Sequence, residues 1–140
     1  MRSKRGFTLV EIMIVVAIIV LLAAIAIPNL LRARLNANEA SAIAAMKTFS
    51  TAMESYRAAQ SPPGYPQCLT FMNGSTPPYI DNVLASGNKS GYTFSLSPGA
   101  NTYSITGTPQ TVNVTGSRNF YVDESGVVRV GSTSAGTPIE

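Results

Sequence analysis

The feature that most restricts the fold of this chain is an apolar run near its N-terminus. Residues Phe7 to Ile27 read FTLVEIMIVVAIIVLLAAIAI, and these 21 residues include a single charged side chain, Glu11. At about 1.5 Å per residue, a helix of this length spans a hydrocarbon core about 30 Å thick. We therefore predict a helix that lies in a membrane or in the apolar core of an assembly.

The charges that flank the apolar run predict its orientation. Three of the ten basic residues, Arg2, Lys4 and Arg5, precede the run, and without them the basic and acidic residues are equal in number. The positive-inside rule places residues 1–6 in the cytoplasm and the C-terminal part of the chain across the membrane. Since the basic excess is confined to the leader, it gives no indication of nucleic-acid binding.

A cleaved secretory signal peptide is the main competing interpretation of the same segment. Its apolar region would be shorter and would end in small residues, a pattern that Ala23, Ala24 and Ala26 imitate. The run is longer than such a region, and helical periodicity continues well beyond it. The sequence therefore favours a helix that is retained in the mature protein.

The sequence lacks most of the side chains on which catalytic sites commonly depend. The sequence has no His and a single Cys, Cys68, which excludes a Ser-His-Asp triad, a His metal ligand and an intrachain disulfide. Asp123 and Glu124 are adjacent, but their Asp-Glu-Ser-Gly context is better explained by two solvated carboxylates in a hairpin turn than by a cation site. We expect no enzyme, no metal and no cofactor.

Glu11 is the most informative single residue. A carboxylate in an apolar span is costly unless it is protonated or paired. Either Glu11 lies near the lipid headgroups, because it is only the fifth residue of the run, or it meets a positive partner. The span holds no basic side chain, so such a partner must come from elsewhere.

The string KRGFTLVEIMIVVAIIVLLAAIAIPNL resembles the N-terminus of type IV prepilins and of type II secretion pseudopilins. The likeness covers roughly the first 35 residues, and the remainder matches only in layout. The positions that carry it are Gly6, Phe7, Thr8, Leu9, Glu11 and Pro28.

In that family a prepilin peptidase cuts after the Gly that ends a short basic leader, and the new N-terminal residue is then N-methylated. The resemblance implies that Gly6 ends the leader and that Phe7 becomes the methylated N-terminus. It also implies that the carboxylate of Glu11 pairs with the Phe7 amine of a neighbouring subunit and so sets the stagger of assembly.

The resemblance implies a structural role. The subunit would be anchored in the inner membrane by one helix and would then polymerise into a homo-oligomeric filament, with the prepilin peptidase and the pilus or secretion assembly machinery as partners. The product is either a cell-surface type IV pilus or a periplasmic pseudopilus, serving adhesion, motility, DNA uptake or secretion. A monomeric signal-anchored binding domain is less favoured, because it has no need of Glu11 or of the Gly6–Phe7 junction.

The helical pattern extends well past the apolar run. Pro28 lies inside it, and because periodicity resumes at once we predict a kink rather than a helix end. Residues 29–60 carry an apolar stripe that we expect to pack on a sheet of the same chain, whereas we expect Glu39 to be solvated or paired with another subunit. The stripe consists of Ile43, Met46, Phe49, Met53 and Tyr56.

The remainder of the chain predicts a small β-rich head. Ser61-Pro62-Pro63-Gly64 ends the helix, and a loop region follows to residue 90. Four short alternating segments then predict an antiparallel meander of three or four strands and a frayed tail. The expected fold class is α+β and pilin-like, with a leader at 1–6, a transmembrane or filament-core helix at 7–28, an amphipathic helix at 29–60 and a head at 61–140.

Overall fold

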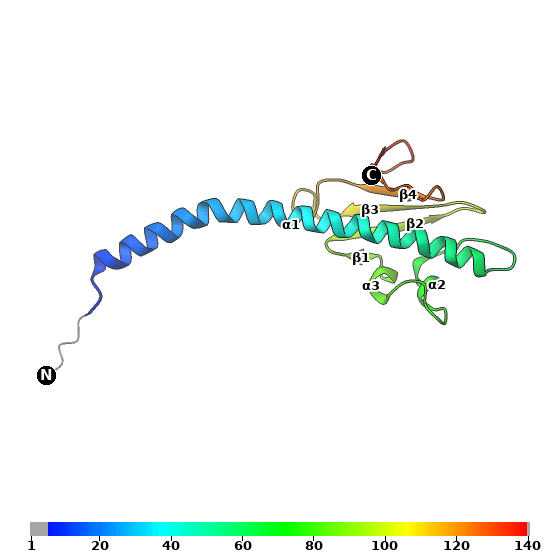
Figure 1. The fold of residues 1–140 in the computed structure, drawn as a ribbon, viewed down its shortest axis with the longest axis horizontal. Helices are drawn as coiled ribbons and strands as arrows, with labels where there is room; N and C mark the ends of the chain where they lie inside the picture. Colours follow the sequence, from blue (N-terminus) through cyan, green and yellow to red (C-terminus); the bar gives the residue numbers. More distant parts are fainter. Residues whose placement is uncertain (1–5, 140) are drawn as a thin grey trace. The chain divides into compact units, whose positions relative to one another are not determined.

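A computed structural model describes residues 6–139, so most of the predicted leader lies outside the described residues. The chain begins with one long helix, α1, over Leu9–Ala59, which Figure 1 shows in blue to green. Contacts divide the chain into two compact units, Met1–Ala33 and Arg34–Glu140.

The N-terminal unit consists mainly of the first half of α1. Pro28 lies inside the helix, which excludes a helix end at this position, and the kink stays a prediction. The large apolar side chains of this segment are all exposed, from 75% at Leu9 down to 50% at Ile12 and Val15. Within the described part of the chain, α1 is the single helix that is long and apolar enough to cross a membrane.

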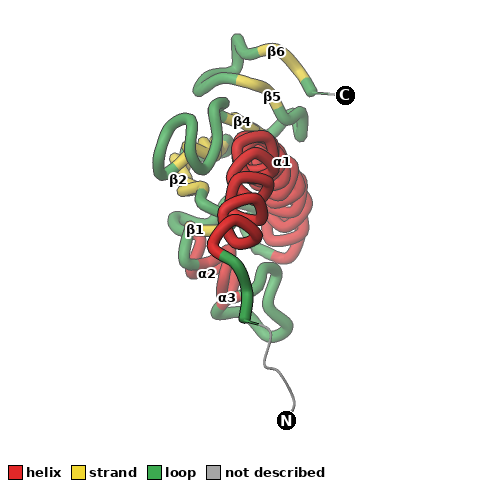
Figure 2. The backbone as a smooth tube through the Cα atoms, turned by 90° about the vertical axis from the view of Figure 1, so that its left-hand side faces the viewer, coloured by secondary structure: helices red, strands yellow, loops and turns green. Residues whose placement is uncertain are grey.

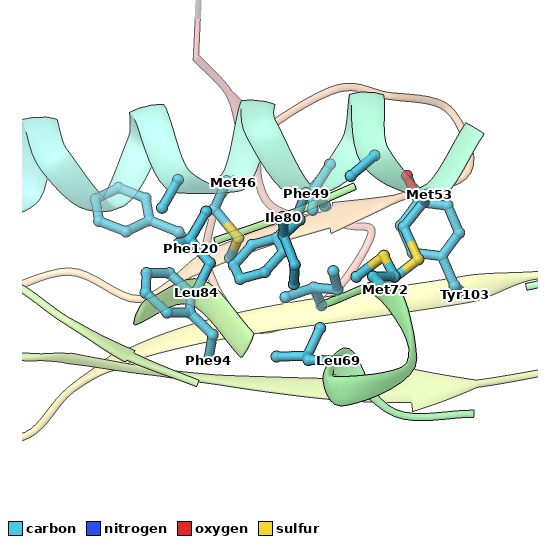
Figure 3. Packing of buried hydrophobic residues seen from close by; sticks show 14 of the residues in the cluster. Met46, Phe49, Met53, Leu69, Met72, Ile80, Leu84, Phe94, Tyr103 and Phe120 are labelled. Atoms are coloured by element: carbon cyan, nitrogen blue, oxygen red, sulfur yellow. The ribbon is translucent and has the colours of Figure 1, made fainter. Parts of the chain in front are cut away.

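The second unit packs the rest of α1 against an antiparallel sheet, as the apolar stripe predicts. Met46, Phe49 and Met53 are fully buried, and Figure 3 shows them pointing from α1 toward the sheet. The ring of Phe49 lies 5.3 Å from that of Phe94 on the sheet. The predicted α+β class and the docking role of the stripe are both confirmed.

The sheet has six strands in sequential order, each antiparallel to the next. The predicted meander corresponds to the middle four strands, and the outer two have only two residues each, too few to show alternation. The strands are β1 (Asn88–Lys89), β2 (Tyr92–Pro98), β3 (Tyr103–Pro109), β4 (Phe120–Asp123), β5 (Arg129–Val130) and β6 (Thr137–Pro138).

The predicted loop region contains two short helices, α2 (Leu69–Asn73) and α3 (Asn82–Ala85). They bring Met72 and Leu84 into the core, and Figure 3 shows Met72 beside Met53. Helices of one turn have no measurable periodicity, which is why the sequence pattern did not reveal them. Cys68 directly precedes α2 and is exposed.

The tail that was expected to fray is folded up to residue 139, so that expectation is wrong for the described residues. Strand β6 pairs with β5, and Figure 2 shows the two lying beyond β4. The backbone N–H of Ile139 donates to the carbonyl of Val128 at 2.8 Å, and its side chain packs against the core. Gly131, at a φ of 129°, provides the left-handed backbone at the end of β5.

Candidate functional site

The described chain starts with an exposed segment that precedes α1. Gly6 and Phe7 belong to no helix or strand, and Phe7 is 83% exposed. No atom lies within 4 Å of the position that a Cβ on Gly6 would take. A protease needs accessible backbone outside regular structure, and this junction meets that requirement.

Thr8 and Glu11 form a capping box at the start of α1. The backbone N–H and the hydroxyl of Thr8 donate to Oε2 of Glu11 at 2.8 and 2.7 Å. In return, the N–H of Glu11 donates to the Thr8 hydroxyl at 3.3 Å. The pair satisfies donors that the first turn of a helix leaves without intrahelical partners. The Thr-x-x-Glu spacing is the sequence signal for this box, and arguments from charge alone miss it.

The capping box gives Glu11 a local structural role beside the predicted intersubunit one. A carboxylate in the first turn is favoured by the positive end of the helix dipole. Both donors of Thr8 use Oε2, so Oε1 stays unused by the cap. Gly6, Phe7 and Glu11 therefore lie within one short exposed stretch, whereas Pro28 lies well inside α1, where it is also exposed.

Glu39 corrects an expectation from the sequence, because it is neither solvated nor left for another subunit. It is 3% exposed, and Oε1 accepts from the N–H and the hydroxyl of Ser117 at 2.9 and 2.8 Å. Oε2 accepts from Nε and Nη2 of Arg118 at 2.7 and 2.6 Å. These partners lie almost eighty residues away in the sequence, so no local pattern relates them to α1.

Further contacts beside Glu39 hold the segment before β4 to α1 and to β2. The amide of Asn38 donates to the carbonyl of Thr115 at 3.0 Å, and the hydroxyl of Tyr92 donates to the carbonyl of Arg118 at 2.9 Å. Burial and then the charge of Glu39 raise the pKa of Tyr92 to about 12, so this hydroxyl keeps its proton. A Cβ on Gly116 would overlap the buried Tyr92 ring, which explains the glycine.

Glu39 should make the stability of the head depend on pH in the acid range. Burial by itself raises the pKa of Glu39, but the hydrogen bonds from Ser117 and the charge of Arg118 outweigh burial and leave the pKa below its usual value. Such a group stabilises the fold above its unfolded pKa, about 4.3, and loses this contribution as the pH falls through the folded pKa.

We expect the free energy of unfolding to drop below about pH 4.3 and Glu39→Gln to weaken that drop. Denaturant unfolding of the parent and the variant over a pH series checks this difference. Identical slopes for the two proteins below pH 4.3 would contradict the role of Glu39.

A helix that is apolar on every side in its first half, capped by Thr8 and Glu11 and continued by a stripe packed on an antiparallel sheet, gives the chain a pilin-like α+β fold. Residues 1–27 match the family model described as the prokaryotic N-terminal methylation motif. This motif belongs to type IV prepilin-like proteins, and its match ends just before Pro28.

Two curated relatives are each similar to a part of the chain. The type IV wide pilus major component PilA4 of Thermus thermophilus is 62% identical over 39 residues, 28% of this chain and 30% of that protein. The type IV major pilin protein PilA of Myxococcus xanthus is 50% identical over 53 residues, 38% of this chain and 24% of that protein. The alignments therefore span less than a third of either relative. No solved structure matches the chain.

Proposed function

We propose that this protein is a structural subunit of a type IV pilus, cut after Gly6 and polymerised through the apolar part of α1. The observation that carries the proposal is the combination at one terminus of an exposed Gly6–Phe7 junction, a capped Glu11 and a helix with no polar face. The role is structural and not catalytic.

The chemistry of assembly follows from cleavage at this junction. Cutting the peptide bond after Gly6 gives Phe7 a free amine, which stays positive after addition of one methyl group. Glu11 of an adjacent subunit offers Oε1, which its own cap does not use. A carboxylate and an ammonium that are removed from water together relieve each other's desolvation, whereas a wrongly staggered subunit leaves both unpaired. The pair therefore selects one register.

The apolar helices supply the contact area of the filament core. Their side chains are exposed in the single chain, so lipid covers them before assembly and neighbouring helices cover them afterwards. Little hydrophobic energy is gained in this exchange, because lipid is as apolar as the helices, and close packing must favour the filament.

A pseudopilin of a type II secretion system is the second candidate. It would share the cleavage, the methylated amine and the helical core, so the N-terminal geometry fits both roles equally. Both relatives are named as pilus components, which favours a pilus.

The mature N-terminus provides the direct test. We expect mass spectrometry of protein from native membranes to find a chain that begins at Phe7 and carries one additional methyl group. Electron microscopy of sheared surface material should then show long filaments that contain it. A mature chain that keeps residues 1–6, or one that starts near Ala26, would overturn the proposal.

A further inference from the structure

The loop between β3 and β4, residues 110–118, presents two exposed apolar side chains from a fixed position. Val112 and Val114 are 64% and 63% exposed, although most of the large apolar side chains of the second unit are buried. We propose that this valine loop contacts an anionic phospholipid surface while the subunit is anchored in a bilayer. The inference rests on the membrane-anchored stage of the proposed function and not on polymerisation.

The valine loop is closed by its own hydrogen bonds. The N–H of Asn113 donates to the carbonyl of Gly116 at 2.8 Å, and the N–H of Thr111 donates to the hydroxyl of Thr115 at 3.1 Å. Asn113, between the two valines, has a φ of 63°, a left-handed conformation that Asn adopts more readily than most residues. The two valines are therefore held in place by a tight turn rather than by a long flexible segment.

The same loop is fastened to the start of the second unit. Asn38 and Glu39 of α1 bind its last residues, as described above. Arg34 is the first residue of that unit, so the loop lies within about two helical turns of the point where the chain enters from its apolar part. Figure 1 shows the β3–β4 connection beside α1 near the α1 label.

The charge around the valine loop is basic. Arg34 and Arg118 are exposed, and Lys89 is brought close because the hydroxyl of the next residue, Ser90, lies 2.9 Å from that of Ser41 on α1. The carboxylate at this end, Glu39, is buried and already paired.

The acidic groups of the head lie farther along α1. Burial, and then charges that include those of Glu54 and Asp123, raise the pKa of Tyr103 to about 12. The hydroxyl of Tyr103 donates to that of Ser50 on α1 at 3.4 Å, which places these carboxylates near Ser50. Ser50 is eleven residues beyond Glu39, or about 16 Å along the helix. The positive charges of Arg34 and Lys89 therefore lie at the end that carries the valines, whereas Lys47 and Arg57 lie farther along α1, where the acidic groups are also found.

This combination suits a bilayer surface better than a protein surface. Protein interfaces favour aromatic anchors, whereas the exposed apolar groups of this loop are two valines. Apolar side chains beside cations fit the headgroup region, where the chains enter the interface and the cations meet anionic headgroups. Both kinds of side chain lie at the end of the second unit where α1 enters it.

Depth-dependent quenching tests the inference on the full chain in vesicles. In a Cys68→Ser background, Val114→Cys carries an environment-sensitive fluorophore, and the vesicles contain phosphatidylglycerol and a lipid with a nitroxide near its headgroup. We expect severalfold stronger quenching and a blue-shifted emission relative to a matched label at Ala100→Cys. Ala100 is an exposed position in the β2–β3 turn, at the opposite end of β3.

A second series of measurements tests the contribution of the basic residues. Quenching at Val114→Cys should fall severalfold in vesicles of phosphatidylcholine alone, in high salt, and in the Arg34→Glu, Lys89→Glu variant. A label at Val16→Cys, near the middle of the apolar run, reports insertion in parallel vesicles whose nitroxide lies deep in the acyl chain.

Each outcome decides the inference. Quenching at Val114→Cys no stronger than at Ala100→Cys, with Val16→Cys fully quenched, overturns the lipid contact and leaves the pilin proposal untouched. Shielding of Val114→Cys that appears only in assembled filaments assigns the loop to a neighbouring subunit and also overturns it. Absence of quenching at Val16→Cys refutes the membrane-anchored state, and this inference falls with it.

Discussion

Glu11→Ala should leave the chain in the membrane and abolish filaments. Removal of a carboxylate makes the apolar segment easier to insert, so the amount of membrane-bound protein should not fall. Assembly should fail because the amine of an incoming Phe7 no longer finds a counter-charge in the apolar core. Membrane fractionation together with electron microscopy of sheared filaments measures both outcomes, and normal filaments would refute the intersubunit role of Glu11.

The capping box makes a control necessary, since Glu11→Ala removes a helix cap as well as a charge. Glu11→Gln keeps an oxygen that accepts from Thr8 but loses the charge, and Thr8→Ala removes a cap hydroxyl but keeps the charge. We expect Glu11→Gln to block assembly and Thr8→Ala to permit it. The reverse result would mean that the helix cap, and not the ion pair, is what assembly requires.

Glu39→Ala should lower the free energy of unfolding of the head by about 3 kcal/mol. The change leaves the N–H of Ser117 without its acceptor, and the valine loop keeps only its other contacts with α1, such as the bond from Asn38 to Thr115. Because the side chain of Arg118 is 50% exposed, water screens part of the loss, and the cost stays at the lower end for a broken buried pair.

Denaturant unfolding of the full chain in detergent measures this loss, with tyrosine fluorescence as the signal because the sequence has no Trp. Glu124→Ala is the matched control, since Glu124 is exposed in a turn and should change stability by about 0.5 kcal/mol or less. Equal midpoints for Glu39→Ala and Glu124→Ala would show that the Glu39 contacts contribute nothing to stability.

Parts of the fold with a long periodic signal were predictable from the sequence. The apolar stripe from Ile43 to Tyr56 and the alternation in β2 and β3 each extend over enough residues to indicate which side is buried. The short strands β4 and β5 were predictable because a turn sequence, residues 123–126, lies between them. Other elements of two to five residues, such as β1, β6 and α2, gave no such signal. The fold class was therefore predictable, and the edges of the sheet were not.

The candidate site divides in the same way. The Gly6–Phe7 junction, Glu11 and the apolar run are adjacent in the chain, so the sequence alone determined that they lie together at the N-terminus. These same residues carry the prediction of a pilin-like fold. Only the tertiary structure showed that Glu39 is buried and paired within its own chain. From the sequence we expected this carboxylate to be solvated or paired with another subunit. Burial there depends on Ser117 and Arg118 arriving from the β3–β4 connection. The physical reason is the distance along the sequence between the residues that interact. Neighbouring residues determine a helix or a terminus, whereas a pair of residues far apart in the sequence forms only when the whole chain packs.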